Sequence, residues 1–230
     1  MSGALIAVAD DLASVAGPLI GAEIQQYIAL TGRCRLALPG GSTPGPTLAW
    51  LAAHLPAEAY GRLWITWVDE RHTPDAADRN DALARHHWLD HAPAAACVLP
   101  MGDGCGDLDE AVEQYVADFQ REFGGIDVAV LGAGPDGHIA SLFPGHPALA
   151  AQGVAVGVPD SPKPPPARLS LTLPTLEDAA FVVVLARGAD KAAMLAEARG
   201  GALPLGRLAP VGAYHWILDP AAAARLGAPA

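Results

Sequence analysis

The sequence is poor in cysteine and in aromatic residues, and it lacks any long apolar run. Its three cysteines, Cys34, Cys97 and Cys105, form no C-x-x-C pair, which predicts free thiols in a reducing cytoplasm rather than a disulfide framework. Aromatic residues make up 6% and are not interleaved with basic ones, so nothing indicates nucleic-acid stacking. No apolar run reaches the ~18–20 residues of a membrane helix, and the first ten residues lack the basic segment of a secretory signal. We therefore expect a cytoplasmic protein with neither a membrane nor a nucleic-acid partner.

Basic residues are also scarce. The 230 residues include 14 basic and 25 acidic ones, for a net charge of −11, and the only lysines are Lys163 and Lys191. A site for an anionic ligand would therefore have to be a local basic cluster. Hydrophobic residues make up 51% and charged residues 17%, which excludes disorder as the main state. The length fits one domain over residues 1–230.

Apolar strand patterns alternate with helical patterns along the chain. Strands are expected at 36–38, 64–68, 97–99, 127–131, 154–158, 168–173, 181–186 and 214–218. Helices are expected at 10–30, 44–54, 79–90, 108–123 and 190–198, with a short last helix after Asp219-Pro220. This order predicts an α/β fold, with a mostly parallel sheet covered by helices on both faces.

Three of these strands end in unusual polar or glycine-rich segments. They are Gly40-Gly-Ser-Thr-Pro44, Asp69-Glu-Arg71 and Gly132-Ala-Gly-Pro-Asp-Gly-His138. Ligands of such folds bind beyond the carboxyl ends of the strands. We therefore expect these three segments to meet at one edge of the sheet and to form a binding site.

The first segment suits a phosphate. Gly40 and Gly41 let the backbone approach a ligand, Ser42 and Thr43 add hydroxyl groups, and the following helix N-terminus is partly positive. A tight turn with a Ser or Thr helix cap requires the same residues and is the alternative. The segment is not a P-loop, because no Gly-Lys-Ser/Thr ending follows.

The third segment matches the dinucleotide pattern G-x-G-x-x-G. Three features argue against a dinucleotide site: Pro135 removes a backbone donor, prolines interrupt the expected crossover helix, and no acidic residue ends an obvious next strand. The same loop holds Asp136 and His138. A histidine with an ordinary pKa of ~6.5 suits a general base, and the carboxylate can orient its ring. A histidine that only caps local backbone is the alternative.

Further charged residues lie at or near strand ends. Asp69 and Arg71 end one strand, and Arg71 could bind a phosphate with two hydrogen bonds or pair internally with its neighbours. Arg168 begins a later strand, and Lys191 opens a helix at the same expected edge. Lys163 lies in the Pro-rich segment 160–167, a stiff surface loop, and is expected in solvent.

The sequence gives little support for a metal site or for a serine nucleophile. His87 and His91 are spaced i, i+4 beside His86, but a third ligand and the glutamate of H-E-x-x-H are missing. A solvated helix face explains these histidines better, so no metal is expected. The G-x-S-x-G elbow of many serine hydrolases is absent.

Taken together, these motifs resemble the 6-phosphogluconolactonase family. The resemblance extends from about residue 5 to 220 and rests on Leu38-Pro-Gly-Gly-Ser-Thr-Pro44, Trp67-Val-Asp-Glu-Arg71 with Asn80, Leu131-Gly-Ala-Gly-Pro-Asp-Gly-His-Ile-Ala-Ser-Leu-Phe-Pro-Gly145, Arg168-Leu-Ser-Leu-Thr-Leu-Pro174 and Lys191. It implies a Rossmann-like fold of the NagB type, hydrolysis of 6-phosphoglucono-δ-lactone in the oxidative pentose phosphate pathway, and no organic cofactor.

The resemblance also implies residue roles. His138 would activate water, Asp136 and Asp69 would line the same pocket, and the phosphate would be held by Gly40, Gly41, Ser42, Thr43, Arg71, Arg168 and Lys191. The related glucosamine-6-phosphate deaminases have a catalytic glutamate five residues after the histidine, where this sequence has Phe143. Deaminase or isomerase activity is therefore the second alternative. A sugar-phosphate-binding protein without activity is the third, although the α/β pattern begins too early to leave room for a DNA-binding module.

Overall fold

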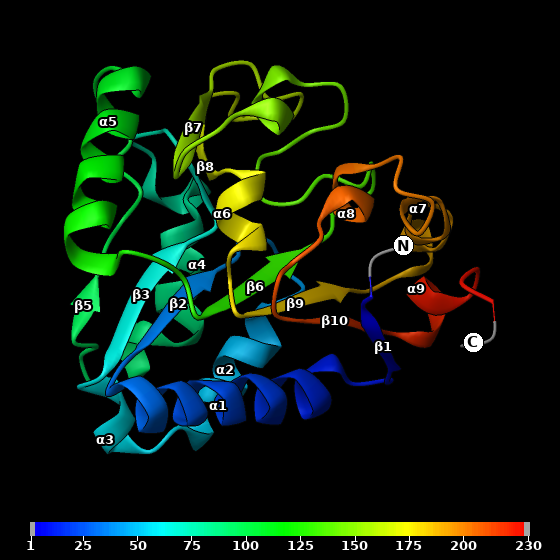
Figure 1. The fold of residues 1–230 in the computed structure, drawn as a ribbon, viewed down its shortest axis with the longest axis horizontal. Helices are drawn as coiled ribbons and strands as arrows, with labels where there is room; N and C mark the ends of the chain where they lie inside the picture. Colours follow the sequence, from blue (N-terminus) through cyan, green and yellow to red (C-terminus); the bar gives the residue numbers. More distant parts are fainter. Residues whose placement is uncertain (1–2, 228–230) are drawn as a thin grey trace.

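A seven-stranded parallel sheet forms the centre of the protein (Figure 1). The structure is a computed structural model that describes residues 3–227. The strand order is β1-β10-β9-β6-β2-β3-β5. The strands are β1 (Leu5–Val8), β2 (Cys34–Leu38), β3 (Leu63–Trp67), β5 (Cys97–Val98), β6 (Val128–Gly132), β9 (Phe181–Ala186) and β10 (Ala213–Leu218). The predicted α/β fold with a mostly parallel sheet is confirmed.

The direction in which successive strands are added to the sheet reverses between β2 and β6. These two strands are neighbours, but the chain continues from β2 to β3 on one side and from β6 to β9 on the other. Loops that leave adjacent parallel strands in opposite directions open a crevice at the carboxyl ends of those strands. The glycine segments after β2 and β6 therefore begin at the same crevice.

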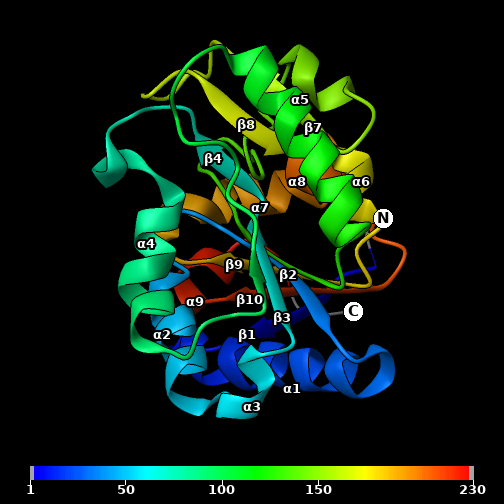
Figure 2. The same cartoon turned by 90° about the vertical axis from the view of Figure 1, so that its left-hand side faces the viewer.

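Helices and a smaller sheet cover the central sheet (Figures 1 and 2). Helix α1 crosses one face beneath β2, β6, β9 and β10 and packs against α2, whereas α5, α6 and the smaller sheet lie on the opposite face. The helices are α1 (Leu12–Thr31), α2 (Gly45–His54), α3 (Ala57–Tyr60), α4 (Asn80–His87), α5 (Leu108–Asp118), α6 (Leu173–Glu177), α7 (Ala192–Ala198), α8 (Pro204–Arg207) and α9 (Pro220–Ala223). None of the described helices is long and apolar enough to cross a membrane.

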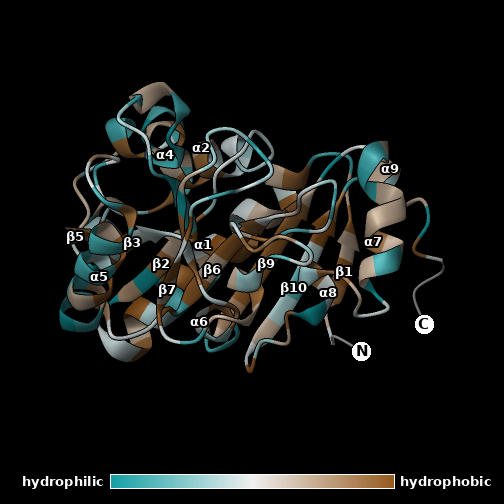
Figure 3. Cartoon of the chain, turned by 90° about the horizontal axis from the view of Figure 1, so that it is seen from above, coloured by the Kyte–Doolittle hydropathy of each residue, from teal (hydrophilic) through white to brown (hydrophobic). Residues whose placement is uncertain are grey.

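Apolar strands between helices explain this architecture. All six residues of β9 are buried, as expected for a strand that is covered on both faces. Figure 3 shows the contrast between these apolar central strands and the more hydrophilic outer turns of α5. At the sheet edge, β1 leaves Leu5 65% and Val8 53% exposed. This strand was not predicted, because it has only four residues, three of them exposed, and so carries little periodic signal.

The smaller sheet was not predicted either. Its order is β4-β8-β7, all antiparallel, with β4 (Asp69–Arg71), β7 (Ala155–Val158) and β8 (Arg168–Leu171). The segments 154–158 and 168–173 thus contain strands as expected, and these strands lie in the separate antiparallel sheet rather than in the central parallel one. The Asp69–Arg71 segment is itself a strand, and β8 pairs with it. This pairing brings Arg168 opposite Arg71 and next to the crevice.

Several predicted helices are longer than the observed ones. Helix α4 ends at His87, and a 3₁₀ turn over Leu89–His91 follows, so His87 and His91 are not on one helix. Helix α7 begins at Ala192, after a 3₁₀ turn over Ala189–Lys191. The short last helix follows Asp219 as predicted, with the Asp219 carboxylate accepting from the Ala222 N–H.

Candidate active site

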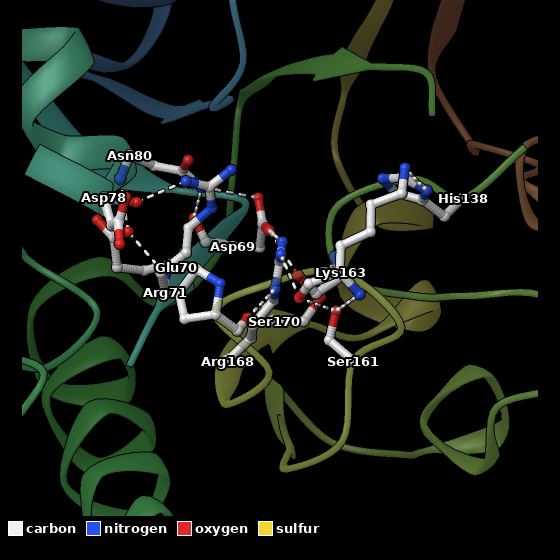
Figure 4. A network of polar contacts seen from close by, with 12 residues as sticks. Asp69, Glu70, Arg71, Asp78, Asn80, His138, Ser161, Lys163, Arg168 and Ser170 are labelled. Carbon is white, nitrogen blue, oxygen red and sulfur yellow. Dashed lines mark hydrogen bonds and ion pairs between the residues drawn. The ribbon is translucent and has the colours of Figure 1, made fainter. Parts of the chain in front are cut away.

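A cavity of about 300 Å³ lies at the carboxyl ends of β2, β3 and β6. All three predicted strand ends line it, together with the Pro-rich loop and the turn before α7. The lining residues are Pro39, Gly40, Gly41, Ser42, Thr43, Pro44, Val68, Asp69, Arg71, Asn80, Gly132, Ala133, Gly134, His138, Ala140, Lys163, Pro164, Arg168 and Lys191. Figure 4 shows the polar network on its walls. The sequence-based expectation that these distant segments meet is confirmed.

The loop after β2 presents unused donors to the cavity. Among residues 3–227, the backbone N–H groups and hydroxyls of Ser42 and Thr43 form no hydrogen bond, and α2 has no side-chain cap. The alternative of a Ser or Thr helix cap is therefore wrong. Gly41 has a φ of 82°, which favours glycine. At Gly40, a Cβ atom would collide with the amide of Asn80, so this glycine allows the loop to pack against α4.

The loop after β6 holds an aspartate–histidine pair. The Asp136 Oδ1 and the His138 Nδ1 are 2.5 Å apart. Burial tends to raise the pKa of Asp136, but the hydrogen bond from His138 and the charges of His138 and Lys163 outweigh it and hold this pKa well below its usual range. Because Asp136 is then ionised and only accepts, the His138 Nδ1 must donate. The free acceptor of a neutral His138 ring is Nε2, as a general base requires.

Two neighbours fix the His138 ring. The Phe143 ring lies under it, with the ring centroids 4.5 Å apart, and is almost fully buried. Gly134 lies against the ring so closely that a Cβ atom there would collide with its Cε1 and Nδ1 atoms. No crossover helix follows this loop: the first helical turn in the described chain after His138 is the 3₁₀ turn Pro147–Ala150. The dinucleotide alternative is therefore not supported.

Asp69 is a buried carboxylate in the cavity wall. Its Oδ2 accepts from the Ser141 hydroxyl at 2.6 Å, and its Oδ1 accepts from the Asn80 amide at 3.2 Å. The nearest Arg168 nitrogen is 4.0 Å from Oδ2. The Asp69 side chain is 8% exposed. These partners hold the carboxylate in one orientation beside the cavity, as the sequence analysis expected for a pocket residue.

Arg168 lines the cavity but also organises the loop before it. Its guanidinium donates to the carbonyls of Lys163, Pro164 and Pro165, at 3.1, 3.3 and 3.2 Å. These bonds fold the Pro-rich loop back over the site. The expectation that Lys163 lies in solvent is therefore wrong: its side chain is 37% exposed, and its Nζ is 3.8 Å from the Asp136 Oδ1. A sequence pattern alone gives no signal for this return of the loop.

The cavity lining contains four basic residues, which we call the cationic wall: Arg71, Lys163, Arg168 and Lys191. The Arg71 Nη1 donates to the Asp78 carbonyl at 2.5 Å, while its buried Nε has no partner in the described part of the chain. Lys191 forms an ion pair with Asp190 at 2.9 Å. Both lysines of this acidic protein thus lie at one cavity. That concentration of positive charge against a net charge of −11 indicates an anionic ligand.

Glu70 supports the site from behind and was not among the predicted site residues. Its carboxylate is 1% exposed and accepts from the backbone N–H groups of Arg71, Asn80 and Asp81, at 2.7, 2.6 and 2.9 Å. It thereby joins β4 to the first turn of α4. Asn80 in turn donates to the Asp69 carbonyl at 2.8 Å. The sequence Asp69-Glu70 alone does not show which of the two carboxylates faces the cavity.

The burial of Glu70 predicts a pH-dependent stability. Burial raises its pKa from 4.5 to about 7, although the three N–H donors and Arg79 lower it. Since the folded-state pKa is the higher one, its contribution to the free energy of unfolding is full below pH 4.5 and is lost as the pH rises through about 7. At ~1.4 kcal/mol per pH unit, the loss amounts to about 3 kcal/mol.

Urea unfolding at several pH values between 4.5 and 8 tests this expectation. The Glu70→Gln variant removes the titrating group, so its free energy of unfolding should fall less than that of the wild type over this interval. Parallel curves for the two proteins would show that Glu70 does not carry the effect. The exposed Glu58→Gln change on α3 serves as the control and should leave the wild-type slope unchanged.

The histidines of α4 and of the 3₁₀ turn after it are not arranged as a group of metal ligands in the described part of the chain. No group of three His, Cys, Asp or Glu side chains suited to a metal occurs in residues 3–227. His86 and His87 lie edge to face, with their ring centroids 4.9 Å apart, and the His91 ring contacts the His86 carbonyl. His86 and His91 are exposed, whereas His87 is half-buried, so the solvated face favoured from the sequence describes two of these three histidines.

The chain is similar to known proteins over almost its whole length. The family described as glucosamine-6-phosphate isomerases/6-phosphogluconolactonase matches residues 7–216. The chain is 38% identical to a 6-phosphogluconolactonase of Mycobacterium tuberculosis, over 94% of this chain and 95% of the relative. It is 36% identical to one of Rattus norvegicus, over 91% of each chain.

The fold comparison gives the same result. The structure of 6-phosphogluconolactonase from Trypanosoma cruzi superposes with a TM-score of 0.87 at 28% identity, covering 99% of both chains. The resemblance stated from the sequence motifs is thereby confirmed along almost the whole length of the chain. The chain belongs to the glucosamine-6-phosphate isomerase/6-phosphogluconolactonase family.

Proposed function

We propose that this protein hydrolyses 6-phospho-D-glucono-1,5-lactone to 6-phosphogluconate, a step of the oxidative pentose phosphate pathway. The observation that carries the proposal is a single cavity in which the Asp136–His138 pair faces a cationic wall and a glycine loop with unused donors. A general base and an anion site in one cavity suit a small phosphorylated ester. The relatives named as lactonases support this substrate class.

The phosphate would bind at the loop after β2. The N–H groups and hydroxyls of Ser42 and Thr43 are free, and the N-terminus of the ten-residue helix α2 lies directly behind them. Arg71 borders the same loop and has an Nε without a partner among the described residues. Gly40 and Gly41 allow the close approach, and Arg168 and Lys191 add positive charge at the cavity wall. This set repeats the phosphate residues expected from the sequence.

His138 would act on water. Its Nε2 takes a proton as the water oxygen forms a bond to C1 of the lactone, and the C1 carbonyl oxygen gains the negative charge. When the C1–O5 bond breaks, the protonated ring returns the proton to the leaving ring oxygen. Asp136 holds the His138 tautomer and stabilises the positive ring in between. The C1 carboxylic acid so formed then loses its proton to solvent, which balances the reaction.

Deaminase and isomerase activity, the second branch of the family, fits the cavity less well. The position five residues after His138 holds Phe143, whose ring is buried beneath His138 and has no titratable group. Opening of an amino sugar ring needs a proton donor at that place. The hydrolytic reaction needs none beyond His138, which is why we favour it.

A coupled assay tests the proposed function. The lactone is generated from glucose 6-phosphate by its dehydrogenase, and NADPH formation by 6-phosphogluconate dehydrogenase is followed with and without this protein. The spontaneous hydrolysis rate is the blank. We expect the protein to raise the rate well above that blank.

The assay also separates the alternatives. A rate equal to the blank would refute lactone hydrolysis. Ammonia release from glucosamine 6-phosphate would then identify a deaminase. Tight binding of sugar phosphates with neither reaction would identify a binding protein without activity.

A further inference from the structure

Lys163 is a cation beside the proposed general base, and its only role so far is the effect of its charge on the pKa of Asp136. Its Nζ is 3.5 Å from the His138 Nδ1 and 3.8 Å from the Asp136 Oδ1. It lines the cavity and is the lysine that the sequence analysis expected in solvent. Any catalytic role for this lysine rests on the proposed lactone hydrolysis.

The Lys163 ammonium has N–H donors that no acceptor among the described residues uses. The His138 Nδ1 already carries the hydrogen that it donates to Asp136, so it cannot also accept from Lys163. The 3.5 Å contact is therefore not a hydrogen bond, and no other acceptor lies within hydrogen-bond reach of this Nζ in residues 3–227. The three N–H groups of a lysine in the cavity wall are thus free for a ligand oxygen.

The backbone of Lys163 is held firmly. Its N–H donates to the Ser161 hydroxyl at 3.2 Å, and its carbonyl accepts from the same hydroxyl and from the buried Arg168 guanidinium. The Ser161 N–H donates to the Pro166 carbonyl and closes the loop. These bonds fix the backbone of the loop at Lys163. The loop places one ammonium group beside the histidine.

The position of Lys163 differs from that of the proposed phosphate residues. Figure 4 shows Arg71 on one side of the Arg168 guanidinium, and Lys163 with His138 on the other. A phosphate bound by the Ser42–Thr43 loop and Arg71 would place the reacting carbon of the lactone, C1, on the side of His138. A C1 oxygen held at that end would have the Lys163 ammonium, 3.5 Å from the His138 Nδ1, as a neighbour.

We propose that Lys163 is a catalytic residue that stabilises the C1 oxyanion during water attack and then binds the C1 carboxylate of the product. Water adds to C1 as His138 takes its proton, and the carbonyl electrons move to the oxygen next to the Lys163 ammonium. When the C1–O5 bond breaks, that oxygen becomes part of the carboxylate. Lys163 keeps its proton throughout, so the balance of the hydrolysis is unchanged. A donor aimed at developing charge contributes about 10²–10³-fold in rate.

Two ligands separate this role from phosphate binding. 6-Phosphogluconate has both a phosphate and a C1 carboxylate, whereas glucose 6-phosphate has the same phosphate and no carboxylate. In Lys163→Met, we expect kcat to fall by about 10²-fold. The Kd of 6-phosphogluconate should rise about tenfold or more, a loss typical of one charge-assisted hydrogen bond, while the Kd of glucose 6-phosphate stays within a factor of two. Lys163→Arg should recover part of both losses.

Arg71→Met is the matched comparison, since Arg71 is the proposed phosphate cation. It should weaken both ligands to the same extent. Equal weakening of both ligands in Lys163→Met would instead make Lys163 a phosphate residue and overturn the inference, as would an unchanged kcat. Circular dichroism and melting curves show whether each variant is folded, and the retained binding of glucose 6-phosphate is a second check.

The failure of this inference is distinguishable from failure of the proposed function. A wild-type protein without lactonase activity overturns the hydrolysis and this role together. An active wild type with an unaffected Lys163→Met variant overturns only the role of Lys163.

Discussion

Replacing His138 by alanine is expected to lower kcat/KM for the phosphorylated lactone by about 10²–10⁴-fold, the usual contribution of a general base. The substitution removes the ring whose Nδ1 is held by Asp136 and whose Nε2 is free at the cavity. The lactone carbonyl is reactive enough to hydrolyse without catalyst, so the rate should approach the spontaneous one. Because the phosphate residues remain, the Kd of glucose 6-phosphate should change little.

His91→Ala is the control for this substitution. His91 is exposed, lies outside the cavity and contacts the His86 carbonyl, so its removal should leave kcat/KM near the wild-type value. A His138→Ala variant that retains kcat/KM within a few-fold of wild type would contradict the assignment of His138 as the base.

Replacing Gly134 by alanine is expected to have the second-largest effect, although it removes no functional group. The added Cβ would collide with the His138 Cε1 and Nδ1, and the ring cannot retreat because Phe143 lies against it. The ring must therefore move relative to Asp136. A displacement of about 1 Å in a reacting group lowers rates by about 10²-fold, and we expect a loss of that size in kcat.

Gly61→Ala provides the matched control, because a Cβ there meets nothing within 4 Å and Gly61 has an ordinary helical φ of −64°. Both variants are compared by kcat and by thermal melting. Wild-type kcat in Gly134→Ala would show that the position of the ring is not critical. A large loss of kcat in Gly61→Ala would show that glycine replacement acts through general instability instead.

The site could be predicted best where polar or glycine-rich residues come directly after a buried strand. The apolar strands 127–131 and 64–68 were evident from composition, and the carboxyl ends of parallel strands meet at one edge. That rule alone predicts that Asp69 and His138 lie together, and the cavity contains both. The expectation of one domain over residues 1–230 remains a prediction.

The residues that the sequence analysis misjudged depend on long-range folding. Lys163 was expected in solvent because proline-rich loops usually lie there, yet the bonds from Arg168 return it to the site. Glu70 was passed over because a carboxylate at a strand end does not reveal which helix it will cap. The separate β4-β8-β7 sheet has the same origin, since strand partners far apart in the chain leave no local signal.

The central claim is that the cationic wall and His138 act on one substrate, which carries both a phosphate and a lactone. The most direct test compares kcat/KM for 6-phosphoglucono-1,5-lactone and for glucono-1,5-lactone, each corrected for spontaneous hydrolysis. Because phosphate binding holds C1 at the base, we predict a preference of at least about 10²-fold for the phosphorylated lactone. Equal values for the two lactones, or no acceleration of either, would contradict the account.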